Sequence, residues 1–306
     1  MATSYGTFSK LLMKDGEAPY TWSGADRFEF LREDIRKYRR FVGHRRGLRG
    51  TRRRHQDSVR EGAYYVHGTV SLYVSPNDVH RLLTRIGFSG GVFQSTMPYF
   101  GMFIHRDHES WEIQDCKVNR WTLQGRAPEF REQGEPEMMV FTMEIFAKDC
   151  VTATWPDPEP SIPTGGTETE NYVFQDGETN VVLNGVAQEL EEFAISADNF
   201  LRPRFAFSRK PVDISARDSQ YGFTATAPYN ATTKALIAGG PDGIDGSVKL
   251  ANGTVSTEFA FGRLIIPTHT PTVRSGKGEI KLRLEGEALD YSTSTNAMAI
   301  TNDNTP

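Results

Sequence analysis

The segment HRDHES (His105–Ser110) contains the closest pair of histidines in the chain. A metal site there would use His105, Asp107 and either His108 or Glu109 as ligands. In a strand, side chains at successive positions point to opposite faces, so His105 and His108 would diverge. Neither a histidine pair at helical i, i+4 spacing nor a CxxC motif accompanies the segment. We therefore expect a solvated turn and no metal site.

Other candidates for chemistry are equally incomplete. The segment GPDGIDG (Gly240–Gly246) resembles part of a calcium loop but lacks the acidic residue that closes one. The glycine-rich phosphate and dinucleotide motifs and the GxSxG motif of serine hydrolases are absent. Cys116 lies in a predicted strand without an activating partner, which indicates an inert core thiol. The sequence predicts no catalytic residue, no cofactor and no enzyme activity.

The remaining feature is a basic block, YRRFVGHRRGLRGTRRRHQ (Tyr38–Gln56), in which eight residues are arginine. Arginine contacts to phosphate would give nonspecific DNA affinity. The block has few aromatic residues for base stacking, however, and its glycines predict a loop rather than a basic helix. A solvated loop and an intersubunit contact are the alternatives. We favour the intersubunit contact, with guanidinium groups facing carboxylates of a neighbouring copy; its candidate residues are Arg45, Arg46, Arg49, Arg52, Arg53 and Arg54.

Charge is divided unevenly along the chain. The 306 residues have a formal net charge of −4, yet residues 1–150 hold 23 Lys and Arg against 19 Asp and Glu, while residues 151–306 hold 12 against 20. A chain that self-associates can place one half against the opposite half of a neighbour. The two cysteines suit a reducing cytoplasm rather than a disulfide framework. No apolar run approaches the roughly 18–20 residues that span a bilayer, so we expect no membrane partner.

The hydrophobic pattern predicts a mainly β protein. Alternation with period two marks Val66–Ser75, Met138–Phe146 and Glu279–Ala288 as half-buried strands. In the last of these, Ile280, Leu282 and Leu284 are expected to share the buried face. SWEIQDCKVNRWTLQG and STEFAFGRLIIPTH indicate further strands less clearly.

Two short helices are expected. Ser75–Gly87 has Ser75 as N-cap, proline in the first turn, an apolar stripe and a glycine stop. Asn230–Gly240 has Asn230 as its cap. We interpret the apolar stripe of the first helix as ordinary core packing.

Residues 154–169 are rich in Pro, Gly and Thr and are predicted to link two domains, residues 1–153 and 170–306. The halves resemble each other in three segments in the same order. The pairs begin at Gly68 and Gly222, at Ser110 and Ser256, and at Met139 and Ile280. A period near 145 residues predicts a duplicated domain.

Several segments, in their order along the chain, resemble the major tail tube proteins of long-tailed bacteriophages. The family pattern is a glycine-led strand and short helix ending in Leu-Leu and Gly, then a Cys-Lys-Val-Asn strand, then an alternating strand ending in Ala-Lys-Asp. Here these are Gly68–Gly87, Asp115–Asn119 and Met139–Asp149, and Ile195–Phe205 resembles a further strand of the family. The family has no catalytic residues. The arginine-rich block is unusual for it.

The resemblance implies two tandem tail-tube domains, each a β-sandwich or barrel-like unit with a short flanking helix. It implies that inner strands join those of neighbouring copies into a β-barrel around a channel, and that rings stack into a tube for the genome. Six tube domains close such a ring in the family, so a duplicated chain predicts trimeric, pseudo-hexameric rings. The partners would be the chain itself, other tail proteins at the tube ends and double-stranded DNA that passes without tight binding. The location would be the virion tail, after assembly in the host cytoplasm.

The channel lining is predicted from the polar faces of four strands, Gly68–Ser75, Met138–Phe146, Gly222–Ala227 and Glu279–Glu287. We expect a lining that is negative on balance, because a lumen that binds phosphate would stall the DNA. Two other functions stay open, a nucleic-acid-binding protein that uses the arginine block and another β-rich tail component such as a hub or terminator protein. The candidate lining residues are Thr142, Glu144, Lys281, Arg283 and Glu285.

Overall fold

The computed structural model describes residues 9–43, 59–89, 91–94, 96–106, 108–127, 138–161, 170–174, 179–237, 242–266, 280–289 and 296–303. These residues are mainly β, as predicted, with two helices among them, α1 (Pro76–Arg85) and α2 (Ala231–Ile237). The strands are β1 (Lys10–Asp15), β2 (Asp26–Phe28), β3 (Arg32–Glu33), β4 (Arg36–Gly43), β5 (Val59–Tyr73), β6 (Phe88–Ser89), β7 (Val92–Phe93), β8 (Phe100–Arg106), β9 (Glu109–Arg126), β10 (Val140–Thr152), β11 (Thr179–Leu183), β12 (Val186–Ala187), β13 (Glu192–Asp198), β14 (Arg202–Arg204), β15 (Asp213–Ser215), β16 (Gln220–Pro228), β17 (Ile244–Asn252), β18 (Val255–Ile265), β19 (Lys281–Leu289) and β20 (Met298–Asn302).

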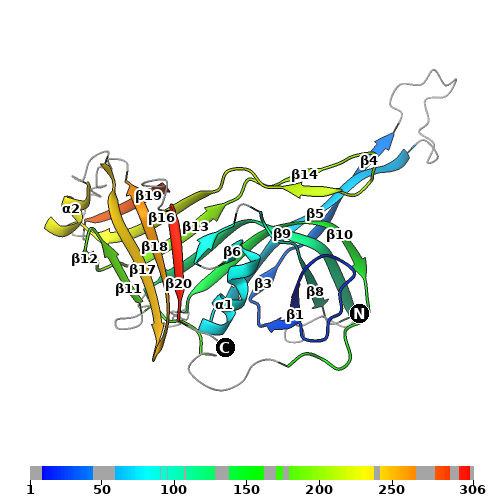
Figure 1. Ribbon diagram of the computed structural model, residues 1–306, viewed down its shortest axis with the longest axis horizontal. Helices are drawn as coiled ribbons and strands as arrows, with labels where there is room; N and C mark the ends of the chain where they lie inside the picture. Colours follow the sequence, from blue (N-terminus) through cyan, green and yellow to red (C-terminus); the bar gives the residue numbers. More distant parts are fainter. Residues whose placement is uncertain are drawn as a thin grey trace.

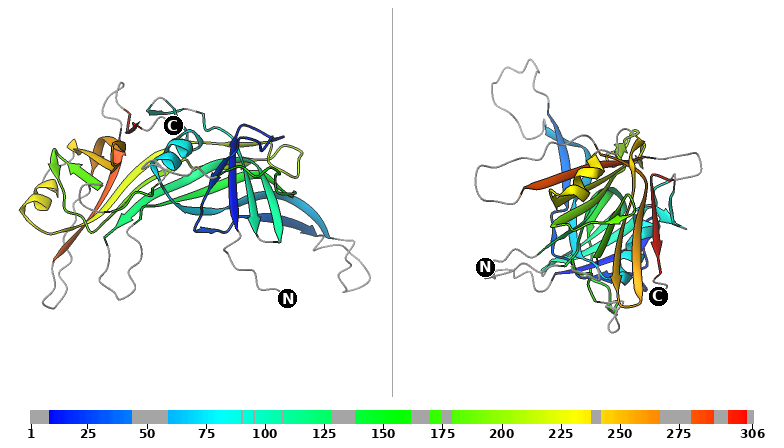
Figure 2. Two further views of the ribbon diagram at one scale, coloured as in Figure 1. Left: turned by 90° about the horizontal axis from the view of Figure 1, so that it is seen from below. Right: turned by 90° about the vertical axis from the view of Figure 1, so that its left-hand side faces the viewer.

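One antiparallel sheet runs through both halves of the chain (Figure 1). Its central strands lie in the order β19, β16, β13, β9, β10, β5, and β3 and β4 pair with the outer edge of β5. The halves meet where β13 pairs with β9 over seven residues, from Glu192 opposite Arg126 to Asp198 opposite Arg120. Figure 2 shows the halves at opposite ends of the long axis with the central strands running between them.

Alternating burial sets the two faces of this sheet. In β10, Phe141, Met143 and Ile145 are buried while the residues between them are partly exposed. The buried faces of all six central strands point to the same side, where they pack with α1 and with residues of strands such as β8, β17 and β18. The period-two prediction is therefore confirmed for β5, β10 and β19. It was wrong for Ile280, which precedes β19 and is 38% exposed.

Both expected helices are present. Ser75 caps α1, because its hydroxyl accepts a hydrogen bond from the Asp78 amide while Asp78 accepts one from the Ser75 amide. In α2 the Asn230 side chain accepts a hydrogen bond from the Thr233 amide. Neither helix has the length and apolar character needed to cross a lipid bilayer.

β17, β18 and β20 cover the buried side of the sheet in the second half, and β1, β2 and β8 cover it in the first half (Figure 1). Buried residues of both halves form one continuous hydrophobic core. Tyr172 ties the halves together. Its amide donates to the Val74 carbonyl, its carbonyl accepts from the Met139 amide, and its hydroxyl lies 3.1 Å from the Thr257 hydroxyl. Burial raises the pKa of Tyr172 to about 12, so the phenol stays neutral in this apolar setting.

The predicted linker is partly fixed to the first half. Trp155 packs edge-on against Phe103. The Glu159 carboxylate accepts a hydrogen bond from Lys10 at 2.7 Å and pairs with Arg27. Residues 162–169 of the linker lie outside the described residues.

Gly68 and Gly222, which begin the first pair of similar segments, lie at positions that belong to opposite faces of the sheet. Gly68 lies between buried Val66 and Val70, whereas Gly222 is flanked by buried Tyr221 and Phe223 and therefore belongs to the polar face. A shift of one residue along a strand moves every side chain to the opposite face. The match of Gly68 with Gly222 was therefore wrong by one position.

Candidate functional site

The exposed face of the central sheet brings the predicted lining residues together. Thr142 in β10 lies opposite Thr122 in β9, which lies opposite Ser196 in β13. Ser196 lies opposite Gly222 in β16, and Gly222 opposite Glu287 in β19. Residues opposite one another in a sheet share a face, so Thr142 and Glu144 point to the same side as Lys281, Arg283 and Glu285.

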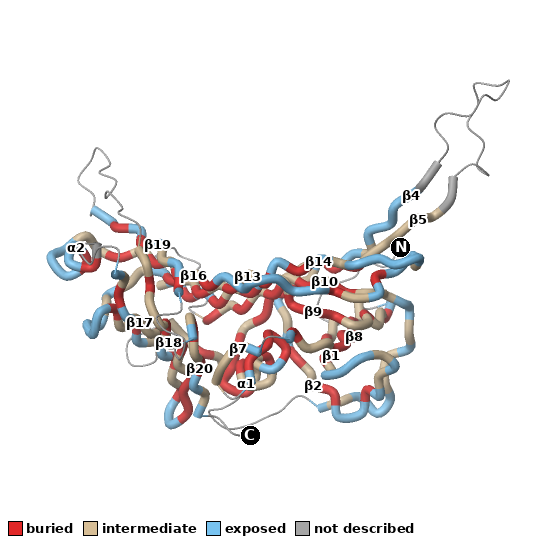
Figure 3. The backbone as a smooth tube through the Cα atoms, turned by 45° about the horizontal axis from the view of Figure 1, so that its top comes forward, coloured by how far each residue is buried: buried red, intermediate tan, exposed pale blue. Residues whose placement is uncertain are grey.

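We call this surface the polar face. It is curved, and Figure 3 shows it as the upper boundary of the molecule from β19 through β16, β13 and β10 to β4. Its residues in β9, β13 and β16 were not singled out from the sequence, although their alternation was visible there. Its members in the five strands from β10 to β19 include Arg120, Thr122, Gln124, Arg126, Val140, Thr142, Glu144, Glu192, Ala194, Ser196, Asp198, Gly222, Thr224, Thr226, Lys281, Arg283, Glu285 and Glu287. Lys117, Phe146 and Lys148 lie on the same side farther along β9 and β10.

Charges on the polar face are mixed and largely paired. In these strands it carries five carboxylates and six Lys or Arg side chains, namely Glu144, Glu192, Asp198, Glu285 and Glu287 against Lys117, Arg120, Arg126, Lys148, Lys281 and Arg283. Arg120 donates to Asp198 at 2.5 Å, and Arg283 lies 2.9 Å from Glu285. Lys281 reaches Glu191, just before β13, at 2.7 Å. Exposed pairs of this kind contribute about 0–1 kcal/mol each to stability, so their main effect is on the local field.

The polar face ends in an open strand edge on each side. In the described part of the chain, β4 pairs with β5 along one edge, and no strand covers its other edge. At the far end, β18 pairs with β19 only from Glu287 to Leu289, which leaves the edge of Lys281–Gly286 uncovered by described strands. Open edges of this length are surfaces on which another chain can add a strand.

The arginine-rich block is only partly described. Tyr38–Gly43, predicted as part of a loop, instead belongs to β4, where Tyr38 lies opposite Tyr65 and their rings stack with centroids 5.5 Å apart. That prediction was therefore wrong for the first residues of the block. The candidates Arg45, Arg46, Arg49, Arg52, Arg53 and Arg54 lie outside the described residues.

The segments considered for metal or thiol chemistry do not form a site in the described part of the chain. His105 lies one residue before the end of β8 and contacts the Ser110 hydroxyl at 2.8 Å across the turn to β9, and Asp107 is outside the described residues. No group of three or more potential metal ligands occurs among the described residues. Burial raises the pKa of the Cys116 thiol well above its usual value, which fits the expected inert thiol.

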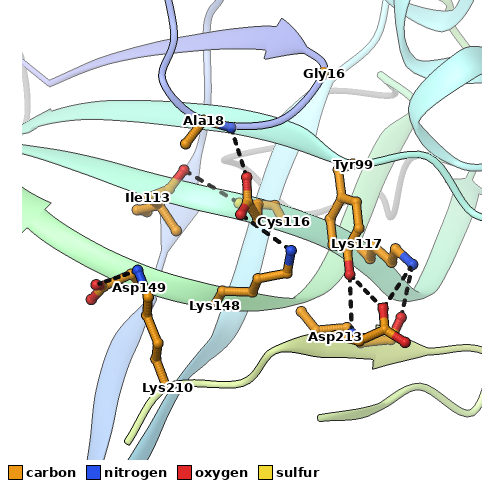
Figure 4. A network of polar contacts seen from close by, with 12 residues as sticks. Gly16, Ala18, Tyr99, Ile113, Cys116, Lys117, Lys148, Asp149, Lys210 and Asp213 are labelled. Atoms are coloured by element: carbon orange, nitrogen blue, oxygen red, sulfur yellow. Dashed lines mark hydrogen bonds and ion pairs between the residues drawn. The ribbon is translucent and has the colours of Figure 1, made fainter. Parts of the chain in front are cut away.

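A second polar cluster, which sequence analysis missed, fixes a β-hairpin of the second half onto the first half (Figure 4). We call this hairpin the arm; it comprises Asn199–Ser219 and includes β14 and β15. The Tyr99 hydroxyl donates to Asp213 at 2.7 Å and accepts from the Ile214 amide at 3.0 Å. Lys117 donates to the Ile214 carbonyl at 2.8 Å.

Two lysines flank the Tyr99 ring, each with Nζ 4.1 Å from its centroid. They are Lys117 and Lys148, the lysines of the two segments DCKVN and AKD. Lys148 also pairs with Asp115 at 3.3 Å. Burial lowers the pKa of Lys117, while the nearby Asp213 carboxylate acts in the opposite direction. Cation–π contacts of this kind stabilise by about 0.5–2 kcal/mol.

Arm attachment is expected to weaken in acid. The hydrogen bond from Tyr99 lowers the pKa of Asp213 below its ordinary value of 3.8. A carboxyl whose folded pKa is depressed contributes stability above its unfolded pKa, and this contribution is lost as the pH falls through the folded pKa. We expect arm amides to exchange hydrogen faster below about pH 4 than at pH 7, relative to amides of β10.

Tyr99→Phe is expected to loosen the arm at neutral pH. It leaves the buried Ile214 amide without its acceptor, at a cost of about 1–3 kcal/mol. Amide exchange measured by mass spectrometry should show increased exchange confined to the arm. Tyr38→Phe, at an exposed position of β4, is the matched control, because it removes a tyrosine hydroxyl outside the arm. Unchanged arm exchange in Tyr99→Phe would contradict this role of the hydroxyl.

Comparison with protein-family models and with the sequences of characterised proteins finds no match to this chain.

Proposed function

We propose that this protein is a structural component of a virion that assembles into stacked rings, forming the tail tube through which a bacteriophage genome passes. The observation that carries the proposal is the polar face, a surface of one sheet that crosses from one half of the chain to the other, is covered by the arm over part of the first half, and ends in strand edges that the described residues leave open. A surface of this form suits the inner wall of a tube. The sequence resemblance points to the same function.

The two halves of the chain have equivalent strand orders, which supports a duplicated tube domain. In the first half the order is β4, β5, β10, β9, and in the second it is β13, β16, β19, β18. A helix follows the second strand of each set, α1 after β5 and α2 after β16. The buried positions of β5 and β16 match with a constant offset of 155 residues, Val66 with Tyr221 and Val70 with Ala225, and the caps Ser75 and Asn230 match with the same offset.

Ring closure follows from this repeat. Within the chain, β9 of the first half pairs with β13 of the second. The counterpart of β13 is β4, whose outer edge is open in the described residues. We infer that β4 of one copy pairs with the open end of the second half of the next copy. Such head-to-tail contacts close into a ring, and three duplicated chains supply the six domains that the resemblance implies.

The mechanism requires no chemistry. DNA slides past a wall whose cations are held in ion pairs such as Arg120 with Asp198. The carboxylates among these residues repel phosphate and oppose a stable complex. The protein would act in the virion tail, after assembly in the host cytoplasm, with other tail proteins at the ends of the tube.

Electron microscopy of the purified protein tests the proposal. We expect hollow tubes, and image reconstruction is expected to show threefold rings with pseudo-sixfold symmetry. Rings of six chains would refute the stoichiometry. Compact monomers under all conditions would refute the function, and monomers with a steeply salt-dependent DNA affinity would favour the nucleic-acid-binding alternative. Short closed rings or caps would favour a hub or terminator protein.

We propose that the basic block (Tyr38–Gln56) forms a contact between neighbouring copies of the chain in the tube. Replacing Arg52, Arg53 and Arg54 together with Ala is expected to impair tube growth while the monomer keeps its melting temperature. Single substitutions are expected to have little effect, because one exposed ion pair contributes about 0–1 kcal/mol. Tube length by electron microscopy and the melting temperature are the measurements. Normal tubes from the triple variant at physiological salt would exclude this role.

A further inference from the structure

The arm and the basic block occupy the same place in the two halves of the chain. The arm connects β13 to β16, and the basic block leads from β4 to β5, which are their counterparts in the first half. Both hairpins shift register by one residue near the base, and in both the extra residue belongs to the second strand. The pairs that show the shift are Arg39 with Tyr64 and Phe41 with Glu61, and Asp198 with Gln220 and Arg202 with Ser215.

The arm covers one end of the polar face in the first half (Figure 1). Lys117 donates a hydrogen bond to the Ile214 carbonyl of the arm at 2.8 Å. Leu201, at the base of the arm, is 5% exposed, and its amide donates to the Asn119 side chain at 2.7 Å. The side chains of Lys117 and Lys148 are only 8% and 13% exposed. The arm therefore takes this end of the polar face out of the channel wall.

Phe41 is the counterpart of Leu201. β4 and β13 match with an offset of 160 residues where β5 and β16 match with one of 155. Leu201 is buried where the arm meets the first half, whereas Phe41 is 64% exposed. An exposed aromatic ring at a position whose counterpart is buried indicates a surface that another part of the assembly covers. The pairs that fix the offsets are Arg36 with His67 and Ser196 with Gly222.

The surface that the arm covers has an apolar counterpart in the second half. The pairing of β10 with β5 and of β19 with β16 gives an offset of 141 residues, so Lys148 matches Leu289. The pairing of β9 with β10 and of β18 with β19 then matches Lys117 with Ile265. Leu289 is 41% exposed and Ile265 is partly exposed. We call these two residues the apolar patch.

The charges of the two hairpins fit this difference. The arm carries Asp213, which lies 4.0 Å from Lys117. The basic block has eight arginines and no Asp or Glu, so it has no carboxylate to offer a lysine in that place. The apolar patch presents no such lysine, and the adjacent Arg263 pairs with Asp245 at 3.1 Å. Each hairpin thus matches the surface that the repeat assigns to it.

We propose that the hairpin of β4 and β5 in one copy covers the apolar patch of the next copy, as the arm covers the first half within a chain. Phe41 lies against Ile265 and Leu289 of that copy. The occupant is a second copy because the same contact between consecutive halves already exists inside the chain. The candidate lining residues stay uncovered, since they lie earlier in β19. This inference rests on the proposed function and assigns a second contact to the edge that joins copies in a ring.

Lysines at the apolar patch test the contact. Ile265→Lys with Leu289→Lys introduces the cations found in the first half, and we expect this variant to lose rings and tubes by sedimentation and electron microscopy. Phe41→Ser is expected to have the same effect. Neither variant should change the melting temperature of the monomer, because all three side chains are exposed or partly exposed in it. Val186→Lys, at an exposed apolar position of β12, is the matched control and should form normal tubes.

Cross-linking tests the position of the contact. In a Cys150→Ser background, we expect a bifunctional maleimide to join Phe41→Cys to Ile265→Cys between copies, which gives covalent dimers and trimers on a denaturing gel. Cys116 is buried and should not react. Phe41→Cys with Val186→Cys is the control pair and should stay monomeric on the gel.

Normal tubes from the double lysine variant, or assembled rings that do not cross-link, would overturn the inference. Normal tubes of that variant that also protect duplex DNA would assign the apolar patch to the channel wall and equally overturn it. Each of these results leaves the tubes of the wild-type chain intact and refutes this contact alone. A wild-type chain that forms neither rings nor tubes refutes the proposed function as well.

Discussion

Gly68→Ala is expected to lower the free energy of unfolding by about 3 kcal/mol, because the new methyl group would overlap neighbouring backbone. A Cβ at Gly68 would lie 2.4 Å from the Ile35 Cα and 2.8 Å from the Ile35 nitrogen. Backbone atoms cannot rotate away as a side chain can, so β5 or the segment at Ile35 must move. In a chain of 306 residues the melting temperature should fall by about 5 °C.

Gly286→Ala is the matched control for Gly68. Gly286 lies in β19 of the same sheet, and a Cβ there would meet its nearest atoms at 3.5 Å, an ordinary contact distance. We expect its melting temperature to change by less than about 2 °C, since alanine fits the strand without displacement. Calorimetry of the two variants makes the comparison. Equal melting temperatures would show that Ile35 moves away at little cost.

Two neighbouring strands of the sheet, β5 and β10, show what the sequence could predict. Alternation identified Val66–Ser75 and Met138–Phe146, because a strand with one face in a core must repeat every two residues. β9 was harder to recognise. Asp115 has a positive φ of 54°, and the pairing with β10 shifts register near Glu144, so the alternation is interrupted twice. Each interruption changes which residues face the core.

The internal repeat stays a prediction, but burial argues against the register in which it was matched. The sequence offers two glycines, Gly68 and Gly222, as a natural match. Burial instead matches Gly68 with Phe223, because both lie on the core side. Few identities connect the halves, so a shift of one residue changes little in the sequence similarity but exchanges the faces of the strand. Aligning the helix caps Ser75 and Asn230 is the sequence signal that gives the correct register.

The arm could not be predicted from the sequence. Tyr99 and Asp213 are 114 residues apart, and nothing near either residue indicates the other. Segment NFLRPRFAFSRKPV combines prolines, arginines and phenylalanines, a composition without helical or strand periodicity. Its conformation depends on contacts with the first half, of which the hydrogen bond from the Tyr64 amide to the Arg209 carbonyl is one. Tertiary contacts of this kind lie beyond local pattern analysis.

Replacing Glu285 and Glu287 together with Lys is expected to convert the tube from a conduit into a DNA-binding surface. Both residues are exposed on the polar face of β19, close to Lys281 and Arg283. The double substitution changes the charge of each chain by four units and removes the Arg283 ion pair with Glu285. The predicted ring of three copies would then present a continuous basic band to the phosphates.

Wild-type tubes are expected to leave added duplex DNA sensitive to nuclease, because the carboxylates of the polar face repel it. Tubes of the Lys variant should protect DNA inside the lumen. If six to ten phosphates are contacted, affinity should fall by about 10³–10⁵ between 50 and 200 mM salt. Nuclease protection at several salt concentrations is the measurement, and electron microscopy checks that the tubes are intact.

Glu285→Gln with Glu287→Gln separates loss of negative charge from gain of positive charge. It removes the same carboxylates without adding cations, so we expect little protection of DNA. Protection by the Lys variant and not by the Gln variant is expected only if the polar face lines the path of the DNA. Intact Lys-variant tubes that protect no DNA would mean that the polar face of β19 does not line the channel. The inner wall would then have to be another surface of the sheet, and the predicted lining residues Lys281, Arg283 and Glu285 would be wrong.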